Sequence, residues 1–159
     1  MCHEVLMEEQ YVIGKPRDIS LLSDSVPVII NMQSGALFQI LDYRNGKLTE
    51  CGNRGQGPSE FLYPTSLKGY LGNTLSFWDV NRKRYSSMSV SLKDSVADLK
   101  HHFNIRDSLF HYEIFPIVEN LYVASGMYED YRLVILNEQG HFKKGYGKCP
   151  SRDSREEKI

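Results

Sequence analysis

Histidines are the side chains of this sequence best suited to metal binding or proton transfer. His101 and His102 adjoin, and His111 follows a short way along the chain. Adjacent residues of a strand point to opposite faces, and neither an H-E-x-x-H run nor a matching carboxylate spacing accompanies these histidines. We therefore interpret them as solvated loop residues, and we predict no metal site and no cofactor.

Carboxylates are plentiful, but their placement indicates turns rather than catalysis. A pair of them could hydrolyse a glycosidic bond only at a set separation in space, which a sequence does not give. Asp42 and Asp79 occupy positions that look equivalent in an internal repeat, where we expect them to bond nearby backbone amides. No G-x-S-x-G elbow is present for serine chemistry, so we predict no catalytic residue. The other carboxylates in question are Glu60, Glu113, Glu129 and Asp130.

A glycine-rich run between Cys51 and Phe61 is the most distinctive motif of the chain. Its glycines can take positive φ or allow backbones to approach closely, and its proline fixes φ where a strand ends. Glu60 could accept hydrogen bonds from amides of the loop or pair with Arg54, and Phe61 could anchor the loop in a core. We predict a structural corner made of Gly52, Arg54, Gly55, Gly57, Pro58, Glu60 and Phe61.

The same run could instead cradle a phosphate, because glycine-rich loops with exposed amides hold anions. Three features argue against this alternative. No Gly-Lys-Ser or Gly-Lys-Thr follows, the next element is strand-like and not helical, and Pro58 removes one amide donor. The structural corner is therefore the favoured interpretation.

Aromatic residues gather in the middle of the chain and offer a second kind of site. Trp78, Tyr63, Tyr70 and Tyr85 could form a surface on which a sugar stacks. Aromatic residues at strand positions more often pack in a core or across strands, so core packing is favoured.

Strands separated by turns account for most of the chain. Apolar and β-branched runs alternate with turn signals such as Asn45-Gly46, and Val26–Met32 with Ala36–Tyr43 has the pattern of a hairpin near a core. Only Leu92–His102 has a spacing that could be helical, with a strand starting at Phe103 as the alternative. The pattern predicts an all-β fold of consecutive antiparallel hairpins, with a β-sandwich as the alternative architecture.

The hairpins form an internal repeat in which an apolar strand is followed by Asp or Asn, a turn and a basic residue. The copies begin at Leu41, Trp78 and Leu136, and their spacing is near that of propeller blades, which have four short strands over roughly 40 to 50 residues. A chain of 159 residues suffices for about three such blades, an incomplete ring. Open blade edges and faces could then support self-association.

Composition excludes several classes of partner. The formal net charge of -1 offers no broad positive field for nucleic acid. The longest apolar stretch, Val26–Met32, is too short to be a transmembrane segment. Cys2, Cys51 and Cys149 form no C-x-x-C pair, so we expect no zinc or redox motif, and both a Cys51–Cys149 disulfide and free thiols stay open.

The glycine-rich run, with Ala36–Asp42 and Asn45–Leu48 before it, resembles the TolB-like six-bladed β-propeller family of bacteria. In that family a strand pair ending in a G-x-x-G-x-G-P-x-E-F run leads to the next blade. The match is close over Leu37–Asp79 and weaker from about Leu92 onward.

The resemblance implies a partial propeller of antiparallel four-stranded blades over residues 19–148, preceded by an N-terminal segment, 1–18, and followed by a polar tail, 149–159. It implies a non-enzymatic binding or scaffold module of the cell envelope whose partner is an unknown protein or carbohydrate. Export with a lipid on Cys2 would fit this location, although no signal peptide is visible in the chain. The alternative is a propeller hydrolase or lyase with a metal or carboxylate site lining the channel.

Overall fold

The computed structural model describes residues 16–33, 35–69, 72–93 and 96–148 as a succession of β-strands. This described part of the chain contains no helix, and hence none that is long and apolar enough to cross a membrane. The strands are β1 (Pro16–Ser23), β2 (Val26–Asn31), β3 (Ala36–Asp42), β4 (Lys47–Asn53), β5 (Pro64–Gly69), β6 (Thr74–Asp79), β7 (Arg84–Ser91), β8 (Val96–Asn104), β9 (Phe110–Val118), β10 (Leu121–Met127), β11 (Tyr131–Asn137) and β12 (Phe142–Lys148).

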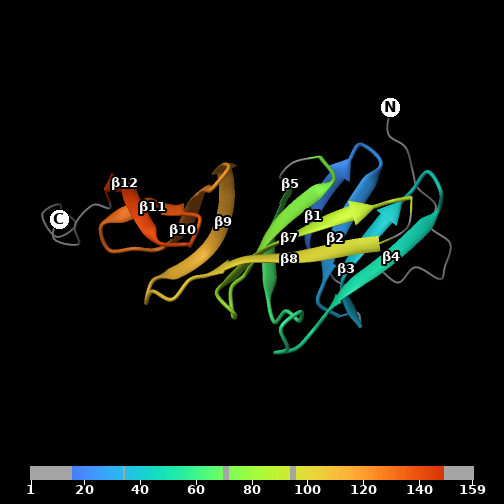
Figure 1. Ribbon diagram of the computed structural model, residues 1–159, viewed down its shortest axis with the longest axis horizontal. Helices are drawn as coiled ribbons and strands as arrows, with labels where there is room; N and C mark the ends of the chain where they lie inside the picture. Colours follow the sequence, from blue (N-terminus) through green and yellow to red (C-terminus); the bar gives the residue numbers. More distant parts are fainter. Residues whose placement is uncertain (1–15, 34, 70–71, 94–95, 149–159) are drawn as a thin grey trace, which may run out of the picture.

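The strands form three antiparallel sheets of four strands each (Figure 1). Sheet 1 holds β1 to β4, sheet 2 holds β5 to β8, and sheet 3 holds β9 to β12, with consecutive strands always side by side. Short hairpin connections produce this order, because a tight turn returns the chain beside the strand it has just left. The expectations of an all-β fold and of about three four-stranded blades are confirmed.

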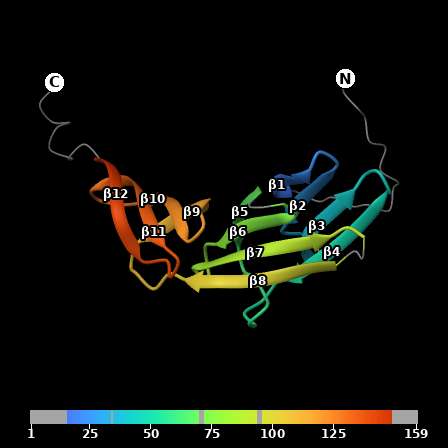
Figure 2. The same ribbon diagram turned by 45° about the horizontal axis from the view of Figure 1, so that its top comes forward.

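The sheets follow one another along an arc that does not close into a ring. β5 contacts both β1 and β9, so the first strands of the three sheets lie together. Figure 2 shows these strands along the concave side of the arc, with the fourth strands, β4, β8 and β12, toward the convex side. The arrangement is that of an incomplete propeller, in which each sheet is a blade.

Two cores hold the sheets together, one on each face of sheet 2. Neighbouring residues of a strand point to opposite faces, so Phe77 and Trp78 of β6 enter different cores. Phe77 packs against Phe38 of sheet 1, with ring centroids 4.7 Å apart. Trp78 joins the core toward sheet 3, and sheet 2 is therefore buried on both faces.

Aromatic contacts dominate the second core. Tyr85 and Phe103 of sheet 2 each place their ring centroid 4.9 Å from that of Tyr122 of sheet 3. Both contacts are edge-to-face, an arrangement that aromatic rings favour. Trp78 and Tyr85, at 1% and 2% exposure, are thus core residues, as expected, and not a sugar-stacking surface.

Both alternatives for Leu92–His102, a helix or a strand that starts only at Phe103, are wrong, because residues 96–104 form β8. A break in the β7–β8 register between Tyr85 and Ser86 shifts the alternation of faces. As a result Leu99 packs against the first core and Phe103 lies in the second, and the sequence loses its period of two.

The histidines also lie elsewhere than expected. His101 and His102 belong to β8 and His111 to β9, so none of them is a loop residue. His101 is exposed, His102 is half-buried with its Nε2 2.8 Å from the hydroxyl of Ser87, and His111 is buried. The interpretation as solvated loop residues is therefore wrong for His111 in particular.

The supposed equivalence of Asp42 and Asp79 is wrong as well. Asp42 ends β3, the third strand of its sheet, whereas Asp79 ends β6, the second strand of its sheet. Hairpin turns use the same residue types whichever strands they join, so the middle copy of the sequence repeat, at Trp78, is out of phase with the copies at Leu41 and Leu136. Both carboxylates nevertheless accept backbone amide hydrogen bonds at their turns, as expected, from Arg44 and from Arg82.

Several expectations concern residues outside the described ranges. These are most of the N-terminal segment, 1–15, the polar tail, 149–159, and with them Cys2, Cys149 and the proposed Cys51–Cys149 disulfide, together with Tyr70. β1 begins at Pro16, within the segment assigned to residues 1–18, and β12 ends at Lys148.

Candidate functional site

The glycine-rich run forms the loop of residues 54–63, which carries the chain from β4 at the outside of sheet 1 to β5 at the inside of sheet 2. Two backbone hydrogen bonds close it. The Phe61 amide donates to the Asn53 carbonyl at 3.0 Å, and the Gly55 amide donates to the Phe61 carbonyl at 3.1 Å. The loop is therefore a defined structure and not an open connection.

Phe61 fastens this loop to the first core. Its ring is 3% exposed and lies with its centroid 5.8 Å from that of Phe38 and 5.1 Å from that of Phe77. Gly52, at a φ of 76°, lies against the same core, and a Cβ there would come within 2.6 Å of the Phe38 ring. Glycine at this position meets both a conformational and a packing requirement.

The Glu60 carboxylate turns back into the loop. Its Oε2 accepts a hydrogen bond from the Gly57 amide at 2.7 Å, and a Cβ added at Gly55 would overlap the same carboxylate. Arg54 and Glu60 form no ion pair in the part of the chain that the structure describes. Arg54 and Pro58 are exposed.

Two arginines of sheet 2 hold the loop by its carbonyl oxygens. Arg82 donates from Nη1 to the carbonyls of Gly57 at 2.5 Å and Glu60 at 2.9 Å. Arg84, which is 5% exposed, donates to the carbonyl of Pro58 at 2.6 Å and also to that of Glu60. Hydrogen bonds from a charged donor are stronger than those between neutral groups, so these contacts tie the two sheets together.

Asp79 completes the corner from the end of β6. Its carboxylate accepts hydrogen bonds from the amides of Leu62 at 2.7 Å, Tyr63 at 3.1 Å and Arg82 at 3.1 Å. Burial lowers the pKa of Arg84, and the charge of Arg82 lowers it further while Asp79 raises it. The guanidinium still carries its charge at neutral pH, because an arginine side chain does not lose its proton in proteins.

We infer that the loop is a structural corner. The amides of Gly55 and Gly57 are occupied inside the loop, by the Phe61 carbonyl and by Glu60. A phosphate would need such amides to be free, and the surrounding contacts present carbonyls to arginines instead.

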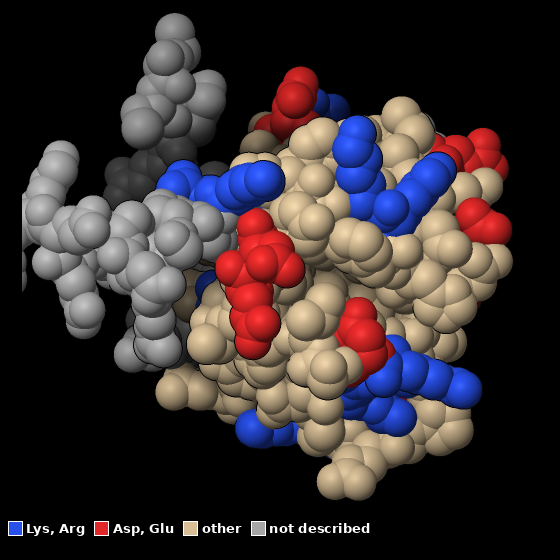
Figure 3. Space-filling view, turned by 90° about the vertical axis from the view of Figure 1, so that its left-hand side faces the viewer, with Lys and Arg blue, Asp and Glu red and all other residues tan. Residues whose placement is uncertain are grey.

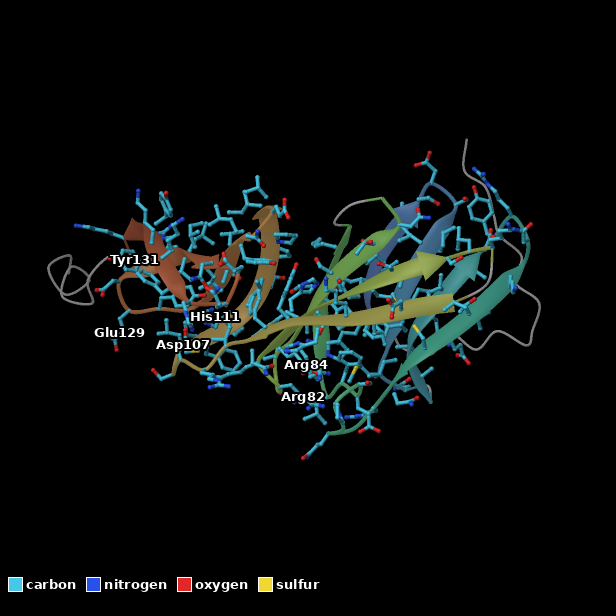
Figure 4. The ribbon with its side chains drawn as sticks, in the orientation of Figure 1. Arg82, Arg84, Asp107, His111, Glu129 and Tyr131 are labelled. Atoms are coloured by element: carbon cyan, nitrogen blue, oxygen red, sulfur yellow. The ribbon has the colours of Figure 1, made fainter. Side chains whose placement is uncertain are left out.

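A pocket of about 470 Å³ lies at one end of sheet 3, where the loop before β9 meets the turn between β10 and β11. Figure 4 shows Glu129 and Tyr131 at the same end of the molecule as Asp107 and His111, away from Arg82. The aromatic and acidic residues of its lining are Phe110, Tyr128, Tyr131, Phe142, Glu129 and Asp130.

Two glycines make room for the tyrosines of this pocket. A Cβ at Gly126 would overlap the Phe110 carbonyl and lie 2.9 Å from the Tyr128 ring, and a Cβ at Gly145 would overlap the ring of Tyr131. Tyr128 therefore packs back against β10, and Tyr131 lies across β12. Any larger residue at either glycine would displace a ring of the pocket.

His111 fixes the position of Tyr128. Its Nδ1 lies 2.7 Å from the Tyr128 hydroxyl, and its Nε2 lies 3.4 Å from both carboxylate oxygens of Asp107. Burial lowers the pKa of His111, against an opposing effect of Asp107, and burial also raises the pKa of Tyr128. With both ring nitrogens engaged, the imidazole positions Tyr128 and is not a free base.

The inner strands, as far as the structure describes them, present few acidic groups. β1 contributes Asp18, whose carboxylate accepts hydrogen bonds from the amides of Ile19 at 2.9 Å and Leu67 at 2.8 Å. β9 contributes His111 and Glu113. No group of three or more His, Cys, Asp or Glu side chains in the described residues is arranged to hold a metal ion.

Sequence reasoning missed the arginines and the tyrosines. The signal available for Arg82 and Arg84 is the basic residue expected after the turn of the internal repeat. Tyr128, His111 and Asp107 carry no such signal, since separate strands and a loop bring them together only in the fold.

The comparisons with known proteins agree with this architecture. A family model described as TolB-like 6-blade propeller-like matches residues 2–159. The search of curated proteins found no match. Since the family match covers nearly the whole chain and the structure shows consecutive four-stranded blades, the chain belongs to the TolB-like six-bladed propeller family.

Proposed function

We propose that this chain is a non-enzymatic binding or scaffold module of the bacterial cell envelope, and that it holds a protein partner on the open face of sheet 3. The open face is the side of sheet 3 opposite the core toward sheet 2, formed by Ile117, Leu121, Val123, Leu133, Ile135 and Tyr146. Phe115 lies at its edge, where the ammonium of Lys68 from sheet 2 comes within 5.7 Å of its ring centroid. One observation carries the proposal. The side of sheet 1 that faces sheet 2 is covered by sheet 2, and the side of sheet 2 that faces sheet 3 is covered by sheet 3. The open face of sheet 3 instead displays apolar side chains.

Strand register places these residues on one side of the sheet. Val123 pairs with Phe115 and with Ile135, and Leu133 pairs with Tyr146. Leu133 and Tyr146 are 44% and 49% exposed, and a hollow of about 480 Å³ lies among neighbouring residues of this face. Figure 3 looks at this end of the molecule and shows uncharged surface interrupted by separate acidic and basic side chains. Contiguous apolar surface of this kind marks protein interaction sites.

The expected occupant is an apolar sheet face of another protein chain. The two existing interfaces of the molecule join sheet to sheet through apolar side chains, and the open face continues that series. Lys143 and Lys144 border the hollow, so acidic groups at the edge of the partner face would complement it.

The envelope location rests on the family resemblance. The alternative of a channel-lining hydrolase or lyase lacks the cluster of acidic or metal-binding side chains that it needs among the described residues. A carbohydrate partner is also less favoured, since Trp78 and Tyr85 are buried in the second core.

A photo-cross-linking amino acid in place of Leu133, in cells that make the whole protein, tests the proposal. The matched control position is Tyr43, which is 41% exposed in the turn after β3. We expect adducts from position 133, recovered in the envelope fraction and identified by mass spectrometry, and few from position 43. Equal yields at the two positions would refute the docking face, and adducts confined to the cytosol would refute the envelope location.

A further inference from the structure

We propose that the pocket at the end of sheet 3 binds a methylated organic cation, such as a quaternary ammonium group. This site is separate from the open face. Its lining includes Val134, which belongs to the core toward sheet 2, whereas the open face is formed by the neighbours Leu133 and Ile135. The inference therefore does not depend on a protein partner.

The chemistry of the lining selects the ligand. Four aromatic rings and two carboxylates line the pocket, from Phe110, Tyr128, Tyr131, Phe142, Glu129 and Asp130, and the lining contains no lysine or arginine. An aromatic face attracts a cation through its quadrupole, and a methylated ammonium loses little hydration when it enters such a site. Carboxylates add an attraction that neutral ligands do not feel, and they repel anions.

The two tyrosine rings are held in place before any ligand arrives. Tyr131 lies over Gly145, and its ring centroid is 6.1 Å from that of Phe142. Tyr128 is held by its contact with His111 at 2.7 Å. A site whose rings are already positioned spends less free energy on ordering side chains when it binds.

The charges around the pocket also favour a cation. The Asp107 carboxylate lies 3.4 Å from Nε2 of His111, whose Nδ1 contacts the Tyr128 hydroxyl, so a further negative charge lies near the pocket wall. Lys83 reaches the same loop, where its ammonium donates to the carbonyls of Asp107 at 2.8 Å and Leu109 at 3.4 Å. Its positive charge opposes a cation, but the carboxylates of Asp107, Glu129 and Asp130 outnumber it. The volume of about 470 Å³ is within the range of small-molecule sites.

Choline and its neutral isostere 3,3-dimethylbutan-1-ol form the test, titrated into the whole protein labelled with ¹⁵N at constant ionic strength. The two probes differ in charge and hardly in shape, so the comparison isolates the cation. We expect choline to bind at least about 10-fold more tightly than the alcohol, with amide shifts around residues 108–110 and 127–131. Equal affinities, or shifts scattered over all three sheets, would overturn the proposal.

Three variants locate the site. Glu129→Gln, at an exposed turn, and Tyr131→Leu are each expected to weaken choline binding, by about 3-fold and about 10-fold. Tyr131→Phe keeps the ring and should bind like the natural protein, which separates loss of the ring from loss of the fold. Glu138→Gln, in the turn between β11 and β12, is the matched control and should change nothing. Unchanged binding by Tyr131→Leu, or equal loss in Glu138→Gln, would contradict the assignment.

Discussion

The contact of Arg84 with the loop between sheets 1 and 2 gives the sharpest prediction about stability. The Arg84→Met change keeps the apolar stem and removes the donors to the carbonyls of Pro58 and Glu60, and also the guanidinium whose central carbon lies 4.6 Å from the Phe61 ring centroid. Each hydrogen bond from a charged donor contributes roughly 1.5 to 3 kcal/mol. In the variant, Arg82 still donates to the Glu60 carbonyl, and water can reach the exposed Pro58, so neither carbonyl is left without a partner. We therefore expect the free energy of unfolding to fall by about 3 kcal/mol, near the lower end of the sum for two such bonds.

Urea unfolding followed by tryptophan fluorescence measures this loss, because the single tryptophan is buried in the core between sheets 2 and 3. Arg84→Lys should recover only part of it, since an ammonium does not reproduce the two-donor fork of a guanidinium. Arg106→Met, at an exposed position, is the control and should cost less than about 0.5 kcal/mol. A loss in Arg84→Met below about 1 kcal/mol, or full recovery by Arg84→Lys, would refute the role of the arginine as a link between the sheets.

Three further measurements test other parts of the structure. Burial raises the pKa of Cys51 to about 11, so in a variant whose other two cysteines are serine we expect negligible alkylation at pH 8 until denaturant is added. Gly55→Ala should lower the free energy of unfolding by about 1 to 3 kcal/mol because its Cβ displaces the Glu60 carboxylate, whereas Gly35→Ala, with open space around it, should be nearly neutral in the same urea assay. Burial lowers the pKa of His111 below its ordinary 6.5, so the unfolded chain takes up a proton before the folded one does, and the free energy of unfolding should fall as the pH drops through about 6.5. Urea unfolding of His111→Gln at several pH values should show a smaller fall. An unaltered profile would show that the histidine is not buried in its neutral form.

The strands that the sequence predicts best are those with two covered faces or strong hairpin turns. β2 and β3 combine β-branched or aromatic residues with such a turn, and they lie where the hairpin of Val26–Met32 and Ala36–Tyr43 was expected. The inner strands β1, β5 and β9 were not expected. β1 and β5 begin with proline and carry polar residues, and β5 includes Ser66 at a φ of 58°, so their alternation is weak.

The candidate sites divide in the same way. The contacts inside the glycine-rich loop could be predicted because they are local in sequence, such as that of Gly57 with Glu60. The contacts of the loop with Phe38, Arg82 and Arg84 could not be predicted. The pocket of sheet 3 could not, because Asp107, His111 and Tyr128 meet only after β9 and β10 pair. Residues that come together only when two strands pair have no fixed separation in the sequence, so no motif identifies them.

The turn after β6 explains how one short stretch of sequence connects three sheets. Arg82 and Arg84 donate to carbonyls of the loop that comes from sheet 1, while Lys83 between them, at a φ of 49°, donates to carbonyls of the loop that leads to sheet 3. Arg82 and Lys83 lie in the turn itself, and with Lys83 in the left-handed region its side chain reaches a different loop from those of its two arginine neighbours. The apolar cores determine how neighbouring sheets stack, but they do not position the loops that connect the sheets. The three basic side chains hold both connecting loops at the same end of sheet 2. The position of the Asp107 loop, and with it one wall of the pocket in sheet 3, is therefore set from sheet 2.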